Sequence, residues 1–378
     1  MSPINNLPPE LKSLLQIIEN NNPDNPKLTA YEEFISNLKV SLKKIEKKEI
    51  ADFWKSQEDT SETEFRMSWV DEDELDAARK NILSHPEKRN SKCFQNLVLH
   101  KKPLYPDNFD IFDELDKELP NFKEVTEFYR GSFALNASRE QSNYQAPRPV
   151  LLLGNPGIGK THYAKKLAKL LGTSYRFFDA NSISTGGVLS GHNASWKGAD
   201  AGLILKELAK SETISPIFLF DEIDKIKSER QYSPFSTFHQ LFEKENAKTF
   251  SDEFVDLTFD ASQIIYILTA NNADNIEDSL LSRMTVFNIE NPSIEDMKKI
   301  IQSIYTNLMD GSKLFTKKLA DSEVEKLVHK SPREVTQILS NNIFNQASNN
   351  SLDKKTSTRP KKLIVELKNS GKQSYIGF

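Results

Sequence analysis

The stretch VLLLGNPGIGKT, residues 150–161, determines the fold expected for this chain. Its first four residues form a continuous apolar run, which is typical of a strand covered on both faces of a parallel sheet. The next eight residues match the pattern G-x-x-x-x-G-K-[ST], a glycine-rich loop that leads from a strand into a helix. In that context the backbone N–H groups of the loop converge on phosphate groups. The sequence therefore predicts a phosphate-binding loop at residues 154–161.

Two side chains of this loop have specific tasks with a nucleotide. Lys160 is expected to reach the β- and γ-phosphates, and the Thr161 hydroxyl is expected to bind Mg²⁺. The alternative, a glycine turn with an incidental lysine, is disfavoured because the motif stands between a predicted strand and a predicted helix. The predicted nucleotide-binding residues are Asn155, Pro156, Gly157, Ile158, Gly159, Lys160, Thr161 and His162.

A second apolar run, IFLF at residues 217–220, ends in two acids. Asp221 at the end of that strand is expected to hold the Mg²⁺ ion with its waters, and Glu222 to polarise the attacking water. Acids often follow buried strands, so the pattern alone is weak. Downstream of a phosphate-binding loop it predicts a site that hydrolyses ATP with Mg²⁺.

The remaining pattern extends this into an α/β fold. Apolar runs at residues 174–178, 264–268 and 285–289 alternate with helical stretches, which predicts a parallel sheet of five strands. After Pro292 the pattern is helical only, and Ser293 and Ser331 are predicted to cap helices there. We predict four segments: a mostly helical N-terminal domain (1–105), an α/β domain with leading helices (106–291), a helical lid (292–347) and a basic, mobile tail (348–378).

Composition excludes several classes of protein. The 378 residues carry a formal net charge of −4, which disfavours a globally basic nucleic-acid binder. No run approaches the ~18 apolar residues of a membrane-spanning helix, and the first residues lack the pattern of a signal peptide. Cys93 is the only cysteine, so no internal disulfide is expected. These features predict a soluble cytoplasmic protein without membrane contact.

Several motifs together resemble the AAA+ ATPase module of Lon proteases, over about residues 106–347. The matching segments are DEIDKI at 221–226, LLSRM at 280–284, SGH and WKG within 190–198, and FSDEFVDL at 250–257. The last of these resembles the hairpin of the branch that also contains DNA translocases. The resemblance implies an AAA+ P-loop fold and assembly into a ring, expected to be a hexamer.

The resemblance also implies roles for three further residues. Asn271 matches a polar residue called sensor 1, which helps to place the lytic water. Arg283 matches an arginine finger that reaches the γ-phosphate in a neighbouring subunit, and Arg333 matches sensor 2 on the lid. The alternatives are a turn asparagine, a surface salt-bridge arginine and an arginine on a solvated helix start.

The segment Trp196-Lys197-Gly198 matches the position at which Lon-like rings carry an aromatic residue in the central pore. The resemblance implies that Trp196 grips an extended polypeptide. The family has an aliphatic residue where this chain has Lys197, which leaves the substrate preference open. Packing of Trp196 in the core is the alternative.

Three functional hypotheses follow. The first is a ring ATPase that remodels, unfolds or translocates polypeptides and works with a separate effector partner. The residues after position 347 are too few for the peptidase domain of Lon, so no intrinsic proteolysis is expected. The second is an AAA+ motor or defence ATPase that engages nucleic acid, which the basic tail would favour. The third is a scaffold whose assembly is controlled by nucleotide.

Overall fold

The computed structural model describes residues 67–84, 100–183, 185–196, 198–226, 234–352 and 360–367 of the chain. The helices predicted before residue 67 lie outside these ranges. So do Cys93, Lys197 and the end of the tail after residue 367.

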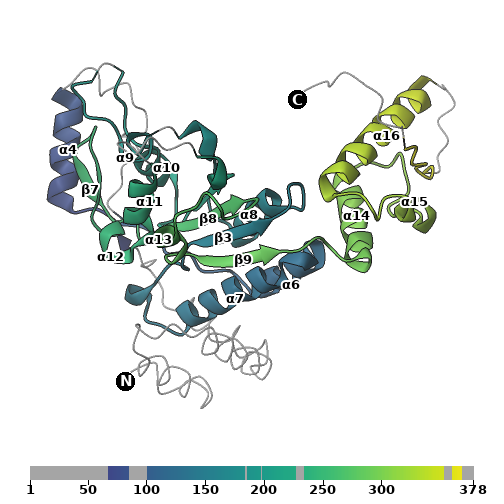
Figure 1. The fold of residues 1–378 in the computed structure, drawn as a ribbon, viewed down its shortest axis with the longest axis horizontal. Coiled ribbons are helices and arrows are strands. Elements are labelled where there is room, and N and C mark those ends of the chain that lie inside the picture. Colours follow the sequence, from purple (N-terminus) through teal and green to yellow (C-terminus); the bar gives the residue numbers. More distant parts are fainter. Residues whose placement is uncertain are drawn as a thin grey trace, which may run out of the picture.

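A sheet of five parallel strands forms the centre of the molecule (Figure 1). The strand order is β4-β5-β8-β3-β9, so β3, which leads into the phosphate-binding loop, lies between β8 and β9. The predicted α/β fold with five parallel strands is thereby confirmed. The strands are β3 (Val150–Gly154), β4 (Tyr175–Asp179), β5 (Ile217–Asp221), β8 (Ile265–Ala270) and β9 (Thr285–Ile289).

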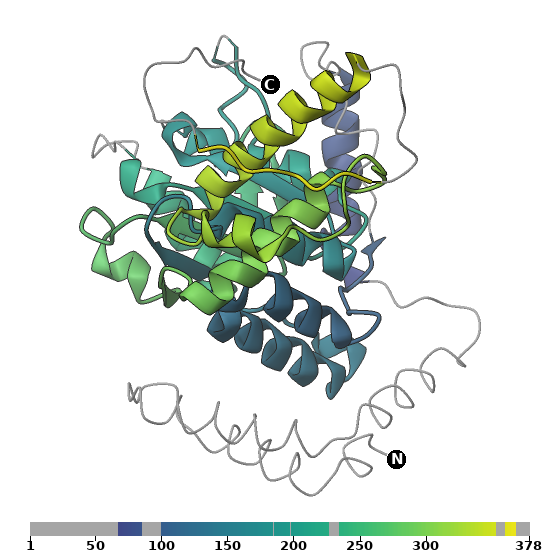
Figure 2. The same ribbon diagram turned by 90° about the vertical axis from the view of Figure 1, so that its right-hand side faces the viewer.

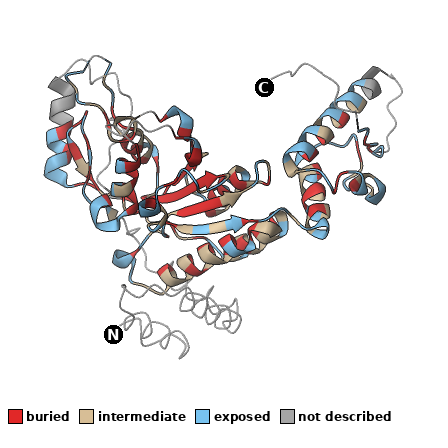
Figure 3. Ribbon diagram, viewed as in Figure 1, coloured by how far each residue is buried: buried red, intermediate tan, exposed pale blue. Residues whose placement is uncertain are grey.

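Burial along the strands follows their place in the sheet (Figure 3). Every residue of β8, and every residue of β5 before Asp221, is buried. The edge strands β4 and β9 are partly exposed, and Phe177 of β4 is 44% exposed. The continuous apolar runs in the sequence therefore belong to the strands that other elements cover on both faces.

Helices cover the sheet on both sides (Figure 1). Phe128 of α7 meets Phe287 of β9 with ring centroids 5.7 Å apart, and Phe238 of α11 meets Phe220 of β5 at 5.0 Å. The helices of the body are α6 (Asp110–Glu118), α7 (Lys123–Ala137), α8 (Lys160–Leu171), α9 (Gly187–Ser190), α10 (Leu203–Lys210), α11 (Pro234–Phe242), α12 (Lys244–Ala247) and α13 (Asp278–Leu281), with 3₁₀ turns at Pro120–Phe122, Gln141–Asn143, Ala180–Ser182 and Ile223–Lys225. Within the described ranges, every helix is too short or too polar to cross a membrane.

The helical lid forms a second apolar core beside the body (Figures 1 and 2). It consists of α14 (Ile294–Leu308), α15 (Asp321–Glu325) and α16 (Pro332–Leu352). Both predicted caps are present. The Ser293 hydroxyl accepts from the backbone N–H of Asp296 at 3.1 Å, and the Ser331 hydroxyl accepts from that of Glu334 at 3.3 Å. The Glu334 carboxylate in turn accepts from the Ser331 N–H, which completes a capping box.

Part of the predicted mobile tail is a packed strand-like segment. Leu363 and Val365 are buried in the lid core. The Lys361 N–H donates to the Leu314 carbonyl at 3.0 Å, and the Lys361 carbonyl accepts from Thr316 at 2.9 Å. For residues 360–367 the expectation of a mobile tail is therefore wrong. The alternation of buried and exposed residues there has a period of two, which a search for helical periodicity misses.

Residues 67–84 and 100–105 pack on the α/β domain. They contain the antiparallel pair β1 (Met67–Ser68) and β2 (His100–Lys101), and α4 (Glu72–Ser84), which lies beside β7 (Figure 1). Strands β6 (Phe250–Asp252) and β7 (Leu257–Phe259) form the predicted hairpin. Trp69 and Leu104 are buried in the same core as the sheet. The predicted boundary at residue 105 therefore does not mark a break in the packing.

We expect Leu363→Ala to lower the free energy of unfolding by about 2–4 kcal/mol, because Leu363 is 1% exposed and its truncation leaves a cavity in the lid core. Ile364→Ala is the matched control, because Ile364 is 59% exposed and its loss should cost less than about 0.5 kcal/mol. Denaturant unfolding of both variants measures the difference. Equal, small effects would contradict the packing of residues 360–367 on the lid.

Candidate nucleotide site

The phosphate-binding loop begins at Gly154, the last residue of β3, which is in register with Ile289 of β9. A Cβ atom on Gly154 would lie 2.5 Å from the Ile289 carbonyl oxygen, so a larger residue cannot occupy this position. The chain turns through residues 155–159, and α8 begins at Lys160. The Lys160 ammonium donates to the carbonyls of Gly154 at 2.5 Å and Asn155 at 3.1 Å. It therefore lies inside the loop that the sequence assigns to phosphates.

The charge of Lys160 depends on its neighbours. Burial lowers the pKa of Lys160 below its ordinary value, and the carboxylates of Asp221, Asp224 and Glu222 act in the opposite direction. An anion bound in the loop would further favour the charged ammonium.

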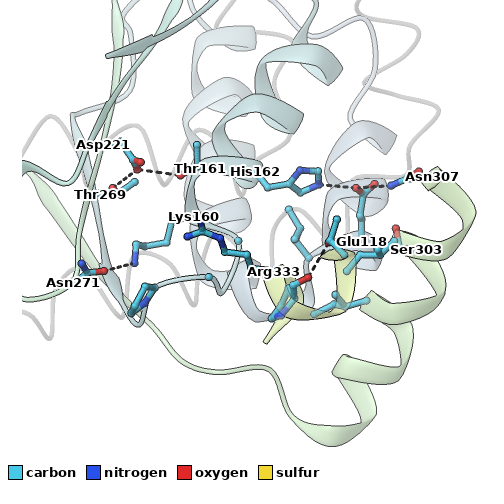
Figure 4. A pocket seen from close by; sticks show the side chains of 18 of the residues that line it. Glu118, Lys160, Thr161, His162, Asp221, Thr269, Asn271, Ser303, Asn307 and Arg333 are labelled. Carbon is cyan, nitrogen blue, oxygen red and sulfur yellow. Dashed lines mark hydrogen bonds and ion pairs between the residues drawn. The ribbon is translucent and has the colours of Figure 1, made fainter. Parts of the chain in front are cut away.

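Asp221, at the carboxyl end of β5, joins two hydroxyl groups (Figure 4). Its Oδ1 accepts from the Thr161 hydroxyl at 3.0 Å and from the Thr269 hydroxyl at 2.6 Å. Thr161 and Asp221 thus bring together two oxygen ligands of the kind that Mg²⁺ prefers. The predicted metal-binding pair is adjacent in the structure.

Glu222 follows directly and has an unusual backbone. Its φ of 59° and ψ of 49° lie in the left-handed region, which glycine usually occupies. The Glu222 N–H donates to the Thr269 hydroxyl at 3.0 Å, which holds this turn in place. The carboxylate lines the cavity and is paired with Lys225 at 2.6 Å.

Asn271 lies beyond the end of β8 and faces the phosphate-binding loop (Figure 4). Its side-chain oxygen accepts from the Lys160 ammonium at 3.4 Å. Its backbone N–H donates to the Asp224 carboxylate at 3.3 Å, which fixes the turn after the strand. Asn271 therefore lies beside Lys160 at the edge of the sheet, and its role as sensor 1 stays a prediction.

These residues line a cavity of about 520 Å³ between the body and the lid. That volume is in the range of small-molecule sites. Arg333, at the start of α16, enters from the lid side, and its Cβ lies 3.3 Å from the position that a Cβ on Gly157 would take. Arg333 thus lines the cavity of its own chain, and its role as sensor 2 stays a prediction.

A network around Glu118 joins three helices at the other end of the cavity (Figure 4). The Glu118 carboxylate of α6 is within 3.0 Å of His162 and accepts from Lys166 at 2.8 Å, both on α8. It also accepts from the Asn307 amide of α14 at 3.5 Å. The hydrogen bond with His162 is the largest cause that lowers the pKa of Glu118 to about 2. A lid residue is therefore linked to a carboxylate of the body.

Some predicted site residues lie away from this cavity. Ile158 is 2% exposed and packs in the core, and the Asn155 amide donates to Asn291 at 3.4 Å, so neither side chain lines the cavity. Arg283 lies outside the cavity of its own chain. Trp196 and Gly198 belong to a surface turn elsewhere on the body.

Five polar residues of the cavity were not in the predicted set: Thr269, Glu118, Ser303, Asn307 and Thr336. Thr269 stands two residues before Asn271 in an otherwise apolar strand, and that polar residue at the strand's end was a usable signal. Glu118 and Asn307 are polar positions on amphipathic helices, and nothing local distinguishes them from solvated residues.

Residues 150–291 match the family described as "ATPase family associated with various cellular activities (AAA)". The chain carries an AAA ATPase domain. Lon protease 1 of Borreliella burgdorferi is 36% identical over 156 residues, which are 40% of this chain and 19% of that protein. Lon protease 1 of Bacillus subtilis is 37% identical over 142 residues, 37% of this chain and 18% of that protein. The AAA domain is thus similar to the ATPase module of Lon, and the match spans about a fifth of these relatives.

Solved structures of Hsp104 share the fold. The S. cerevisiae Hsp104:casein complex matches with a TM-score of 0.54 and 16% identity, over 75% of this chain and 52% of that chain. A closed-state reconstruction of Hsp104 with ATPγS and FITC casein matches with a TM-score of 0.52 and 18% identity, over 74% and 52%. At these identities the likeness concerns the arrangement of the AAA fold.

We expect Thr269→Val to lower ATP turnover by about one to two orders of magnitude, because it removes one of the two hydroxyl donors to the Asp221 carboxylate and the acceptor of the Glu222 N–H. Thr306→Val removes a hydroxyl bonded only locally to the Gln302 carbonyl and should leave turnover unchanged. Steady-state phosphate release measures both. Equal turnover in the two variants would show that Thr269 does not hold the acids.

Proposed function

We propose that this protein binds ATP with Mg²⁺ between its AAA domain and its lid and hydrolyses it to ADP and phosphate. The observation that carries this proposal is the convergence on one cavity of Lys160, Asp221, Glu222 and Asn271 from the body and Arg333 from the lid. These groups come from separate strand ends and from the separate helical core of the lid. Their convergence is therefore produced by the fold and not by closeness in the sequence.

Each side chain has one task in the proposed reaction. Lys160 and Arg333 bind the phosphate oxygens and offset their charge. Glu222 accepts a proton from the attacking water, and Asn271 orients that water. Thr161 and Asp221 fit Mg²⁺, which supplies charge stabilisation at the transferred phosphoryl group when it is bound.

We propose a ring, a hexamer, in which each active site is completed by Arg283 of a neighbouring subunit. The Arg283 guanidinium donates to the Glu243 carboxylate at 3.1 Å and to the Ser279 carbonyl at 2.6 Å. Its side chain is 33% exposed. These contacts hold a cation at the surface, outside the cavity of its own chain, where a second copy could meet it.

The proposed substrate is an unfolded polypeptide that the ring remodels or translocates. Trp196 is 60% exposed, which argues against core packing within one chain. Its backbone closes a turn, with its N–H bonded to Asn193 at 3.0 Å and its carbonyl to Ala199 at 3.1 Å. An indole presented on a turn supplies a large apolar contact for an extended chain. A separate effector partner and a cytoplasmic location stay predictions.

A complementation experiment tests the shared active site. Glu222→Gln and Arg283→Ala should each abolish ATP turnover when assembled alone. A mixture of the two should recover part of it, because an Arg283→Ala subunit still has Glu222 and its Glu222→Gln neighbour still has Arg283. Phosphate release is measured as a function of mixing ratio.

The control for that experiment is the double variant Glu222→Gln/Arg283→Ala mixed with either single variant, because the double variant supplies neither group and neither mixture should recover turnover. Absence of recovery in the Glu222→Gln and Arg283→Ala mixture would place both residues in one subunit's site. Normal turnover by Glu222→Gln alone would remove Glu222 from the reaction.

A side-by-side assay tests the substrate. ATP turnover is measured with unfolded casein, single-stranded DNA and duplex DNA, in wild type, Trp196→Ala and the matched exposed-aromatic control Phe344→Ala. We expect casein to stimulate wild type and Phe344→Ala, and Trp196→Ala to lose the stimulation while keeping basal turnover. Recovery of intact casein would support the prediction that the chain itself does not cleave it.

Other outcomes of the same assay favour the other hypotheses. Stimulation by DNA that falls steeply with salt, and none by casein, would indicate a nucleic-acid motor. Turnover that none of the three polymers changes would indicate a nucleotide-controlled scaffold.

A further inference from the structure

The β6–β7 hairpin lies against the segment that presents Trp196. We call the described residues 191–196 and 198–202, between α9 and α10, the Trp196 loop. The Glu253 N–H in the turn of the hairpin donates to the Ser190 carbonyl at 2.9 Å, just before this loop begins. The ends of the loop are also joined to each other, because the His192 N–H donates to the Asp200 carbonyl at 3.2 Å.

Asp252, the last residue of β6, binds the hairpin turn and the Trp196 loop with its two carboxylate oxygens. The residue is 1% exposed. Its Oδ1 accepts from the N–H groups of Phe254 and Val255, each at 3.0 Å. Its Oδ2 accepts from the Gly202 N–H at 2.6 Å. One buried carboxylate therefore closes the hairpin turn and holds the end of the Trp196 loop.

A glycine at each end of the loop allows close packing around Asp252. A Cβ on Gly202 would lie 2.1 Å from the Leu189 carbonyl oxygen, and a Cβ on Gly191 would lie 2.8 Å from the Asp252 Oδ1. The two ends of the loop thus approach each other and Asp252 too closely for larger residues. Burial raises the pKa of Asp252 to about 6, and the three N–H donors and the charge of Lys206 oppose that rise.

The hairpin is itself fixed from its other side. The Asp260 N–H donates to the Trp69 carbonyl at 2.7 Å, Val70 forms a bridge with Phe259, and the Thr258 N–H donates to the Glu74 carboxylate at 3.2 Å. The hairpin is therefore anchored to residues 67–74 and gives the Trp196 loop a fixed support.

We propose that Asp252 is the positioning residue of the Trp196 loop: it holds the Gly202 end to the β6–β7 hairpin, while the Glu253 N–H holds the chain at Ser190, so that Trp196 moves with the body of the subunit. The effect of this positioning on a bound substrate rests on the polypeptide-translocating function proposed above. A loop that flexes independently would not transmit movement of the domain to a bound chain, whereas a loop fixed at both ends does.

Asp252→Asn tests this with a change of almost no volume. An Asn side chain has one carbonyl oxygen and one NH₂ group, so it cannot accept both from the hairpin turn and from Gly202. We expect hydrogen exchange of amides in residues 191–202 to become about tenfold faster or more, with no change in α8. Asp260→Asn is the matched control, because the one hydrogen bond that the Asp260 side chain makes within the described part of the chain is local, from the Ser262 N–H at 2.7 Å.

Function is measured on the same variants. Asp252→Asn should keep basal ATP turnover and lose the stimulation by casein, and Asp260→Asn should keep both. In the Trp196→Ala background, Asp252→Asn should cause no further loss. If Asp252→Asn does not fold, Gly202→Ala breaks the same link from the loop side and should give the same exchange pattern.

The outcomes separate the two proposals. Unchanged exchange in residues 191–202 of the folded Asp252→Asn protein would overturn the positioning role, whatever casein does. Faster exchange in a protein whose wild type does not respond to casein would uphold the positioning role and overturn the polypeptide substrate. A matching loss of basal turnover would show a general defect of the domain and would also overturn the positioning role.

Discussion

The parallel pairing of β3 with β8 on one side and β9 on the other is the constraint on which the site depends. Parallel strands bring their carboxyl ends to the same edge of the sheet, and ligands of open α/β sheets bind outside that edge. Leu152 is in register with Thr269, so the phosphate-binding loop starts two residues beyond the level at which the Thr269 hydroxyl bonds Asp221. The close approach of Gly154 to β9 then fixes where the loop turns.

At this edge the polar groups satisfy one another before any ligand binds. The Thr269 hydroxyl donates to Asp221 and accepts from the backbone of Glu222, so one side chain sets the position of both acids. The left-handed backbone of Glu222 is held by that contact. A site preorganised in this way does not have to reorder its acids when a nucleotide binds. Such preorganised positioning and electrostatic stabilisation are the main sources of catalysis in phosphoryl transfer.

The lid and the peripheral segments determine how this edge is used. The lid has an apolar core of its own, so the cavity between it and the body changes whenever the two cores move relative to each other. The contact of Asn307 with Glu118 crosses that boundary. Residues 360–367 complete the lid core, and residues 67–74 anchor the β6–β7 hairpin. Segments near both ends of the described chain therefore stabilise the lid and the hairpin.

The sequence by itself determined what local patterns encode: the phosphate-binding loop, the acids after β5, the five strands and the caps at Ser293 and Ser331. Each of these depends on neighbours within a few residues, and hydrophobic runs report burial directly. Only the tertiary structure decided the contacts of Asp221 with Thr269, of Glu118 with Asn307 and of Asp252 with Gly202, which are 48, 189 and 50 residues apart. Such pairs leave no local pattern, because a buried carboxylate is satisfied by whichever donors the fold brings to it.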